Sequence, residues 1–182
     1  MRERVGEAPM ADPLGYFITW ATYGTWLPGD ERGWVEYRHG WQLPDPALKL
    51  EAEAKMTENA CRLDAEQRRA VEEQIAETCQ VRGWQLHAVN CRSNHLHVVV
   101  SANADPKRVR SQLKAWCTRK LKSLEAARMA ATGIEASLRE NWWAERGSQR
   151  FINDVDSLEA ATLYVRDGQD KRDRHTKADR VH

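Results

Sequence analysis

The sequence predicts an α+β fold in which helices pack on one face of an antiparallel sheet. Two observations lead to this prediction. Segments rich in β-branched and aromatic residues alternate with segments in which apolar residues recur every three or four positions. They follow one another in the order strand, helix, strand, strand, helix, strand, helix, as in ferredoxin-like and RRM-like sheets. The chain has 182 residues, 41% of them hydrophobic, and is long enough to bury one core.

The N-terminal third contains one expected strand and one irregular stretch. Residues 1–14 are polar and predict a flexible lead-in. Residues 15–26, GYFITWATYGTW, are rich in aromatic and β-branched side chains and predict the first strand. Glycines and prolines are frequent from about residue 30 to 63, where we expect an irregular excursion with at most a short helix near ALKLEAEAKM.

A helix and a hairpin are expected next. Asp64 and Gln67 have the spacing of a capping box, and apolar residues then recur every four positions until Gly83, which is expected to end the helix. Residues 84–91 predict a strand. The sequence RSN predicts a tight turn into a second, antiparallel strand, HLHVVVS, at residues 95–101.

A long helix is predicted to begin at Asp105 and Pro106, to continue to about Ala131 and to break at Gly133. Its apolar stripe is expected to bury Trp116. Its other faces carry the most concentrated basic surface of the chain: Lys107, Arg108, Arg110, Lys114, Arg119, Lys120 and Lys122. Such a face either contacts the phosphates of a nucleic acid or is simply solvated, and the sequence leaves both alternatives open.

The last expected elements are a short strand at residues 149–152 and a helix that Asp156 caps and that ends near Gly168. No internal repeat or low-complexity segment is present in the sequence. We therefore expect a single domain over residues 15–172, followed by a disordered tail at residues 173–182.

Composition excludes several classes of protein. The net charge is only +1, so any contact with nucleic acid must come from a local basic patch. The four cysteines form no CxxC pair, which predicts reduced thiols in the core rather than disulfides. No apolar stretch approaches the roughly 20 residues that span a bilayer, and the first residues lack the apolar region of a signal peptide. We expect a cytoplasmic protein with no membrane partner.

The segment SNHLHVVVS, residues 93–101, places two imidazoles at the start of an apolar strand. Side chains two positions apart on a strand share one face, so His95 and His97 are expected to point the same way. Such a pair can hold a divalent cation such as Mg²⁺ or Mn²⁺ when further ligands complete the shell. The alternative is a pair of hydrogen-bonded histidines at a strand edge, because a two-residue pattern often arises by chance.

SNHLHVVVS resembles the HUH motif (His, bulky apolar residue, His) of single-tyrosine transposases, including the REP-associated tyrosine transposases of bacteria. Three other segments resemble the same family. YFITWATYGTWLPGD is similar to its opening strand, WWAERGSQRFI to its Trp and Gly-Ser segment, and LEAATLYVRDGQ to its final helix. The resemblance extends over about residues 15–170.

The resemblance implies that His95 and His97 bind Mg²⁺ or Mn²⁺ and that Tyr164 is the nucleophile. Helical periodicity alone instead places Tyr164 beside a buried stripe, where a packing role would explain it. The family often supplies a third metal ligand one turn after the tyrosine. That position is Gly168 here, and the nearest amide, Gln169, lies beyond the expected helix end.

His87 is an alternative third ligand. It would share the face of the pair if Cys91 were opposite His95 in the hairpin, whereas a shift of one residue would turn it away. A partly buried strand histidine with no metal is the competing interpretation of His87. Zinc binding by Cys91 with the histidines is a minor alternative, because the spacing is unlike that of structural zinc sites.

The activity that the resemblance implies is nicking and rejoining of single-stranded, hairpin-bearing DNA through a 5′-phosphotyrosine intermediate. The enzyme would work as a monomer or homodimer near the nucleoid, and the basic helix would contact DNA. Two other functions stay open. One is a domesticated protein that binds DNA repeats without cutting them, and the other is a metal-dependent phosphohydrolase that uses water.

Overall fold

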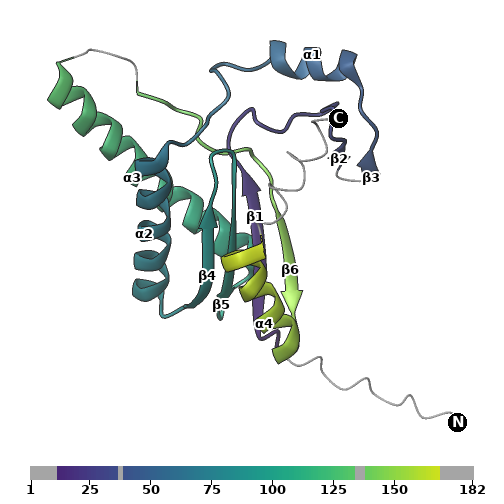
Figure 1. Ribbon diagram of the computed structural model, residues 1–182, viewed down its shortest axis with the longest axis vertical. Coiled ribbons are helices and arrows are strands. Elements are labelled where there is room, and N and C mark those ends of the chain that lie inside the picture. The colour runs from purple at the N-terminus through teal and green to yellow at the C-terminus, as the bar shows by residue number, and fades with distance from the viewer. Residues whose placement is uncertain (1–11, 37–38, 134–137, 169–182) are drawn as a thin grey trace, which may run out of the picture.

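A computed structural model describes residues 12–36, 39–133 and 138–168. Its centre is a four-stranded antiparallel sheet in the order β4-β5-β1-β6 (Figure 1). The two inner strands are β1 (Gly15–Ala21) and β5 (His95–Ser101), and the outer strands are β4 (Gln85–Cys91) and β6 (Ser148–Ile152). The predicted α+β class with an antiparallel sheet is therefore confirmed.

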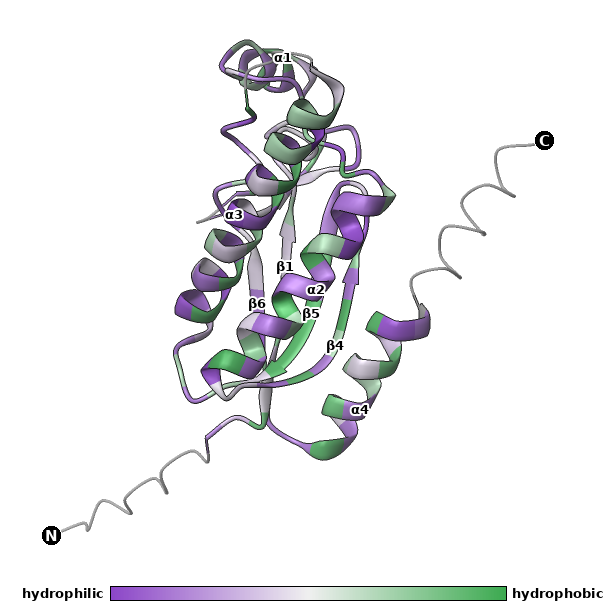
Figure 2. Ribbon diagram, turned by 90° about the vertical axis from the view of Figure 1, so that its left-hand side faces the viewer, coloured by the Kyte–Doolittle hydropathy of each residue, from purple (hydrophilic) through white to green (hydrophobic). Residues whose placement is uncertain are grey.

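Two long helices, α2 (Ala65–Arg82) and α3 (Pro106–Thr132), pack on one face of this sheet. Alternate side chains of β1 and β5 face them. The fully buried members of this core include Ile18, Trp20, Leu96, Val98, Val71, Ile75, Leu113 and Leu121. Burial of each such side chain contributes about 1.5–3 kcal/mol, so this layer holds α2 and α3 to the sheet. Figure 2 shows both helices with hydrophilic and hydrophobic residues alternating along them.

The final helix, α4 (Val155–Leu163), and the π-helical turn that continues it, η1 (Tyr164–Gly168), lie on the opposite face. There Ala161 and Val165 form a second apolar cluster with Ala88, Val99 and Ile152 of the strands. Val99 lies two residues after His97 on β5, so it shares the face of the histidine pair. The end of the chain that carries Tyr164 is thus anchored on the histidine face.

Several predicted helix ends are confirmed. Asp64 and Gln67 form the reciprocal capping box at the start of α2, and Gly83 ends that helix with a left-handed φ of 67°. The N-cap predicted for the last helix was wrong by two residues. Asp154 is the cap, because its carboxylate accepts from the backbone N–H of Ser157, and Asp156 lies in the first turn.

The excursion between β1 and α2 is more regular than predicted. The expected short helix is α1 (Pro46–Ala54), but a small hairpin of β2 (Trp34–Glu36) and β3 (Gly40–Gln42) precedes it. The indole N–H of Trp26 donates to the Gly33 carbonyl at 2.9 Å, which holds the start of this segment in place. Figure 1 shows α1, β2 and β3 together beyond one end of the main sheet.

The strand β1 ends at Ala21, five residues earlier than the predicted strand. A turn with Gly24 at a φ of 70° follows it. The four cysteines are buried free thiols, as predicted. The predicted tail, and the lead-in up to residue 11, lie outside the described residues. Among the described helices, none has the length and hydrophobicity that crossing a membrane requires.

Candidate functional site

The two histidines of β5 lie side by side on the sheet face that carries α4. In the β1–β5 ladder His95 is opposite Ala21 and His97 is opposite Thr19. The two ring centroids are 5.0 Å apart, with the rings at 80° to each other. The prediction that both imidazoles point to the same face is confirmed.

Each imidazole is oriented by a hydrogen bond at Nδ1. The His95 Nδ1 donates to the side-chain oxygen of Asn94 at 2.8 Å, since that oxygen can only accept. The His97 Nδ1 lies 2.7 Å from the hydroxyl oxygen of Thr19. With the proton on Nδ1, the lone pair of the His95 ring is on Nε2, the arrangement that neighbouring residues impose on metal-binding histidines. The Thr19 hydroxyl can donate or accept, so its contact orients the His97 ring.

His97 is neutral at physiological pH. Burial lowers its pKa to about 4, and the nearby His95 and Arg92 act in the same direction. The ring of Phe17 is stacked on it, with the centroids 5.4 Å apart. A neutral imidazole binds a cation without first losing a proton, so the low pKa favours metal binding at neutral pH.

Tyr164 lies next to this pair. Its ring centroid is 6.1 Å from that of His97 and 6.1 Å from that of Phe17, with an edge-to-face geometry in both cases. The residue is 36% exposed, so part of it is open to solvent. Residues distant in the sequence are thereby brought to one place on the sheet.

Two contacts of Val165 hold the turn that carries Tyr164. The side chain of Val165 is fully buried in the apolar cluster on this face. The side-chain amide of Asn90 donates to the Val165 carbonyl at 3.2 Å, and Asn90 is directly opposite His97 in the β4–β5 ladder. Asn90 was not among the residues singled out in the sequence. Its place opposite His97 follows from the hairpin register, which differs by one residue from the register assumed in the sequence analysis.

The structure does not bring His87 to the histidine pair. Cys91 is opposite Leu96 rather than His95, so the register assumed for His87 was wrong by one residue. In addition, β4 has a β-bulge at His87. The Nε2 atom of His87 lies 2.8 Å from the hydroxyl of Ser101, at the far end of β5 from the histidine pair. Gln169, the other suggested ligand, lies outside the described residues.

The minor zinc alternative is also contradicted. Cys91 belongs to the core between the sheet and α2, on the opposite face from the histidine pair. Burial raises the pKa of its thiol to about 12, and the nearby charge of Glu72 adds to the increase. A thiolate, the form that binds zinc, is therefore disfavoured.

Within the described residues, His, Cys, Asp and Glu side chains form no group of three or more that is placed to hold a metal ion. The donors that the site offers are the Nε2 atoms of His95 and His97. Two imidazoles suit two positions around Mn²⁺ better than around Mg²⁺, which prefers oxygen ligands. Water and phosphate oxygens are suitable donors for the remaining positions.

The basic face of α3 is only partly available. Lys114 is half-buried and donates to the backbone carbonyls of residues 144, 145 and 146, and burial lowers its pKa to about 8. Arg110 donates to the Gly147 carbonyl at 2.7 Å, and Lys122 pairs with Glu140 at 3.6 Å. The remaining members of the predicted set are exposed: Lys107, Arg108, Arg119 and Lys120.

Trp116 is not the core residue that periodicity predicted. Its side chain is 40% exposed on α3, and the guanidinium of Arg119 lies 4.6 Å from its ring centroid. Since α3 packs on the opposite face from the histidine pair, these exposed residues lie across the sheet from the site.

Arg150 is a cation on the histidine face that the sequence analysis did not single out. It is opposite Phe17 in the β1–β6 ladder, and its guanidinium lies 5.6 Å from the Phe17 ring centroid. The residue is exposed. Its neighbour Phe17 contacts both His97 and Tyr164, so Arg150 adds positive charge at the border of the site.

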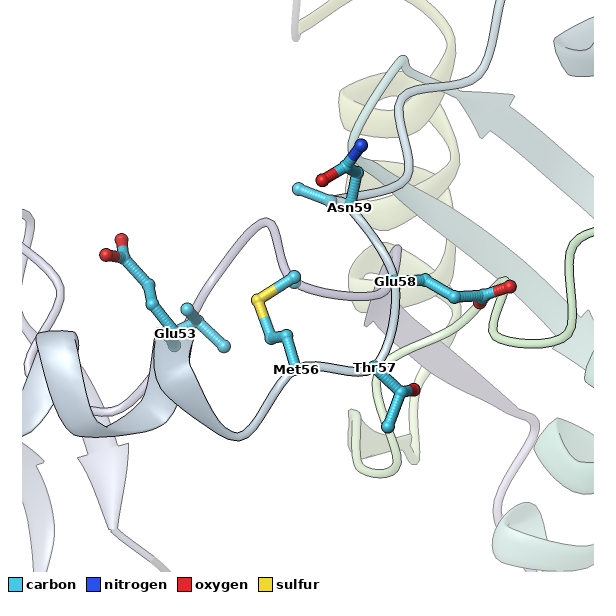
Figure 3. A pocket seen from close by; sticks show the side chains of 8 residues that line it. Glu53, Met56, Thr57, Glu58 and Asn59 are labelled. Atoms are coloured by element: carbon cyan, nitrogen blue, oxygen red, sulfur yellow. The ribbon is translucent and has the colours of Figure 1, made fainter.

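Two hollows of about 570 and 290 Å³ lie in the excursion, and neither is lined by the histidine pair or Tyr164. Figure 3 shows the larger one, with Glu53 and Glu58 directed away from Met56. The Glu58 carboxylate accepts from the backbone N–H groups of Glu140 and Asn141, and these bonds lower its pKa. Glu58 thus ties the excursion to the segment before β6.

Two solved transposase structures are similar to the chain. One is a REP-associated tyrosine transposase bound to a REP hairpin, at 12% identity and a TM-score of 0.48 over 94% of this chain and 74% of that one. The other is a candidate transposase from Deinococcus radiodurans R1, at 14% identity and a TM-score of 0.46 over 88% of this chain and 92% of that one. No family model and no curated protein matches the sequence.

Proposed function

We propose that this protein is a metal-dependent single-tyrosine transposase that nicks and rejoins single-stranded, hairpin-bearing DNA. The observation that carries the proposal is the approach of Tyr164 to His97, with 6.1 Å between ring centroids, on the face that also holds His95. The resemblance of four sequence segments to that family supports the same assignment. A phenol beside two oriented imidazoles provides a nucleophile and a cation site within reach of one phosphate.

In the proposed reaction the Tyr164 hydroxyl oxygen attacks the phosphorus of a DNA phosphodiester and releases its proton to solvent. The bond between phosphorus and the 3′-oxygen breaks, and this oxygen takes up a proton to become a free 3′-hydroxyl. The DNA 5′ end is then joined to Tyr164 as a phosphotyrosine. Attack by another 3′-hydroxyl reverses the step and joins the strands, so no external energy source is consumed.

His95 and His97 would hold Mn²⁺ or Mg²⁺ through Nε2, and a bound cation would draw charge from the scissile phosphate. A phenol has an ordinary pKa of about 10 and is a weak nucleophile at neutral pH, so this electrophilic assistance matters. Thr19 and Asn94 keep the two rings in position. Phe17 covers one face of His97 and limits the access of water to it.

Positive charge on both sides of the sheet would bind the DNA backbone. Arg150 would contact phosphates near the scissile bond, whereas the exposed cations of α3 would contact DNA that extends around the molecule: Lys107, Arg108, Arg119 and Lys120. Single-stranded DNA is the favoured substrate because its exposed backbone can approach Tyr164 closely.

The test is incubation of the protein with hairpin-bearing single strands and Mn²⁺, followed by a denaturing gel. A protein band of higher mass is expected with the unchanged chain and none with Tyr164→Phe. DNA binding without any adduct or cleavage would support the non-cleaving repeat-binding protein instead. Cleavage without an adduct would support a hydrolase that uses water.

A further inference from the structure

We propose that Asn90 is a positioning residue that sets where the Tyr164 hydroxyl lies relative to His97, an inference that rests on the proposed function of Tyr164. Asn90 is on β4, opposite His97 on β5, and its amide donates to the Val165 carbonyl at 3.2 Å. One side chain thus connects the strand pair that carries the cation site to the turn that carries the nucleophile.

The local backbone explains why the turn needs this contact. Residues 164–168 form a π-helical turn at the end of α4, where the ordinary i to i+4 bonds of the α-helix are replaced. The short α4 has nine residues and is marginal without tertiary contacts. The direction in which Tyr164 points therefore depends on how η1 is held against the sheet.

Val165 makes two contacts that hold η1, and they differ in kind. The buried Val165 side chain packs against Ala88 and Val99, and apolar packing of this sort is not directional. The hydrogen bond from Asn90 is directional and fixes the rotation of the turn about its axis. Tyr164 and Val165 are adjacent, so a rotation of the Val165 carbonyl moves the phenol as well.

The register of the hairpin also places Asn90 close to His97. A residue opposite His97 has its Cβ about 5.5 Å from that of His97, close enough for both side chains to share one neighbour. Because Asn90 occupies this place, loss of its hydrogen bond to the Val165 carbonyl would free η1 to rotate relative to the strand that carries His97. A displacement of the reacting group by about 1 Å costs roughly 100-fold in rate.

The test uses two variants at Asn90 and one matched control. Asn90→Leu keeps the approximate shape but has no donor, and Asn90→Asp keeps a polar side chain of the same size that cannot donate to a carbonyl when ionised. Thr162→Val is the control, because it removes one side-chain hydrogen bond within α4, from the Thr162 hydroxyl to the Leu158 carbonyl, without touching the sheet.

The first readout is proton NMR of the metal-free protein without DNA, which measures cross-relaxation between the Tyr164 and His97 rings. We expect this signal in the unchanged protein and in Thr162→Val, and its loss in both Asn90 variants while the melting temperature shows them folded. An unchanged signal in either folded Asn90 variant would overturn the proposal, and so would its loss in Thr162→Val.

The second readout is the rate of covalent adduct formation over a range of DNA concentrations up to saturation. Both Asn90 variants are expected to form the adduct about 10- to 100-fold more slowly, with KM for DNA unchanged within about twofold. An increase in KM at unchanged rate would contradict a positioning role. If even the unchanged protein forms no adduct, the proposed function fails, while the NMR result still decides the role of Asn90.

Discussion

The hydroxyl oxygen of Thr19 lies 2.7 Å from Nδ1 of His97, across the β1–β5 ladder. A residue of the neighbouring strand thus sets the orientation of an imidazole on the face of the site. Such outer contacts to metal-binding histidines typically contribute 10- to 100-fold to metal affinity.

Thr19→Val removes the hydroxyl and keeps the β-branched shape that suits the strand. We predict a decrease of about 10- to 100-fold in Mn²⁺ affinity, measured by calorimetry or by the electron paramagnetic resonance of free Mn²⁺. Thr132→Val is the matched control, since it removes a hydroxyl bond to the Arg128 carbonyl at the far end of α3. Equal affinity in Thr19→Val and the unchanged protein would contradict this role.

The low pKa of His97 predicts a pH dependence of stability. In the folded protein this pKa is about 4, below the ordinary value of 6.5, so the unfolded chain binds a proton first as the pH falls. The associated stability is fully present above about pH 6.5 and is lost as the pH decreases toward 4, by about 3 kcal/mol at most.

This loss can be isolated by chemical denaturation of the metal-free protein at pH 7 and pH 4. His97→Asn lacks the titrating ring, so its stability should fall by less between these pH values than that of the unchanged protein. An NMR titration gives the pKa itself, and a midpoint near 6.5 for His97 would contradict the buried, neutral ring described above.

Much of the fold could be predicted from the sequence, because caps and periodicity are local signals. The capping box at Asp64 and the glycine at residue 83 placed α2, and the paired histidines could be assigned to one face from strand alternation alone. The hairpin register could not be predicted, since the turn sets which residue lies opposite His97 and the bulge at His87 shifts the pairs beyond it. That register moved His87 away from the site and brought Asn90 to it.

Other misses have the same origin in tertiary context. Periodicity on α3 predicted that Trp116 is buried, but the core is filled without it and the indole packs under Arg119 instead. Basic residues on a helix look equivalent in a sequence. Only the packing of the segment before β6 distinguishes Lys114, which is half-buried, from the exposed Lys120.

Lys114 is predicted to stabilise the fold rather than to bind DNA. Its ammonium group donates to three successive backbone carbonyls, with the shortest distance 2.7 Å to Ala144. Lys114→Met leaves these carbonyls without this donor and should lower the free energy of unfolding by about 1–3 kcal/mol. Urea denaturation measures this change, and a variant as stable as the unchanged protein would contradict it.

The exposed cations of α3 are predicted to bind DNA and to contribute little to the stability of the fold. Lys120→Gln should leave the free energy of unfolding within about 0.5 kcal/mol of the unchanged value. It should weaken binding of single-stranded DNA and lower the slope of log affinity against log salt by roughly one. Fluorescence anisotropy at several salt concentrations measures both quantities, and an unchanged slope would place DNA elsewhere on the molecule.

The central claim is that Tyr164 becomes covalently joined to DNA, and mass spectrometry of the linked peptide tests it most directly. After reaction with a hairpin-bearing single strand and Mn²⁺, protease and nuclease digestion should leave a phosphorylated nucleotide on the peptide that contains Tyr164. The same modification on another residue, or cleaved DNA with an unmodified Tyr164 peptide, would contradict the account.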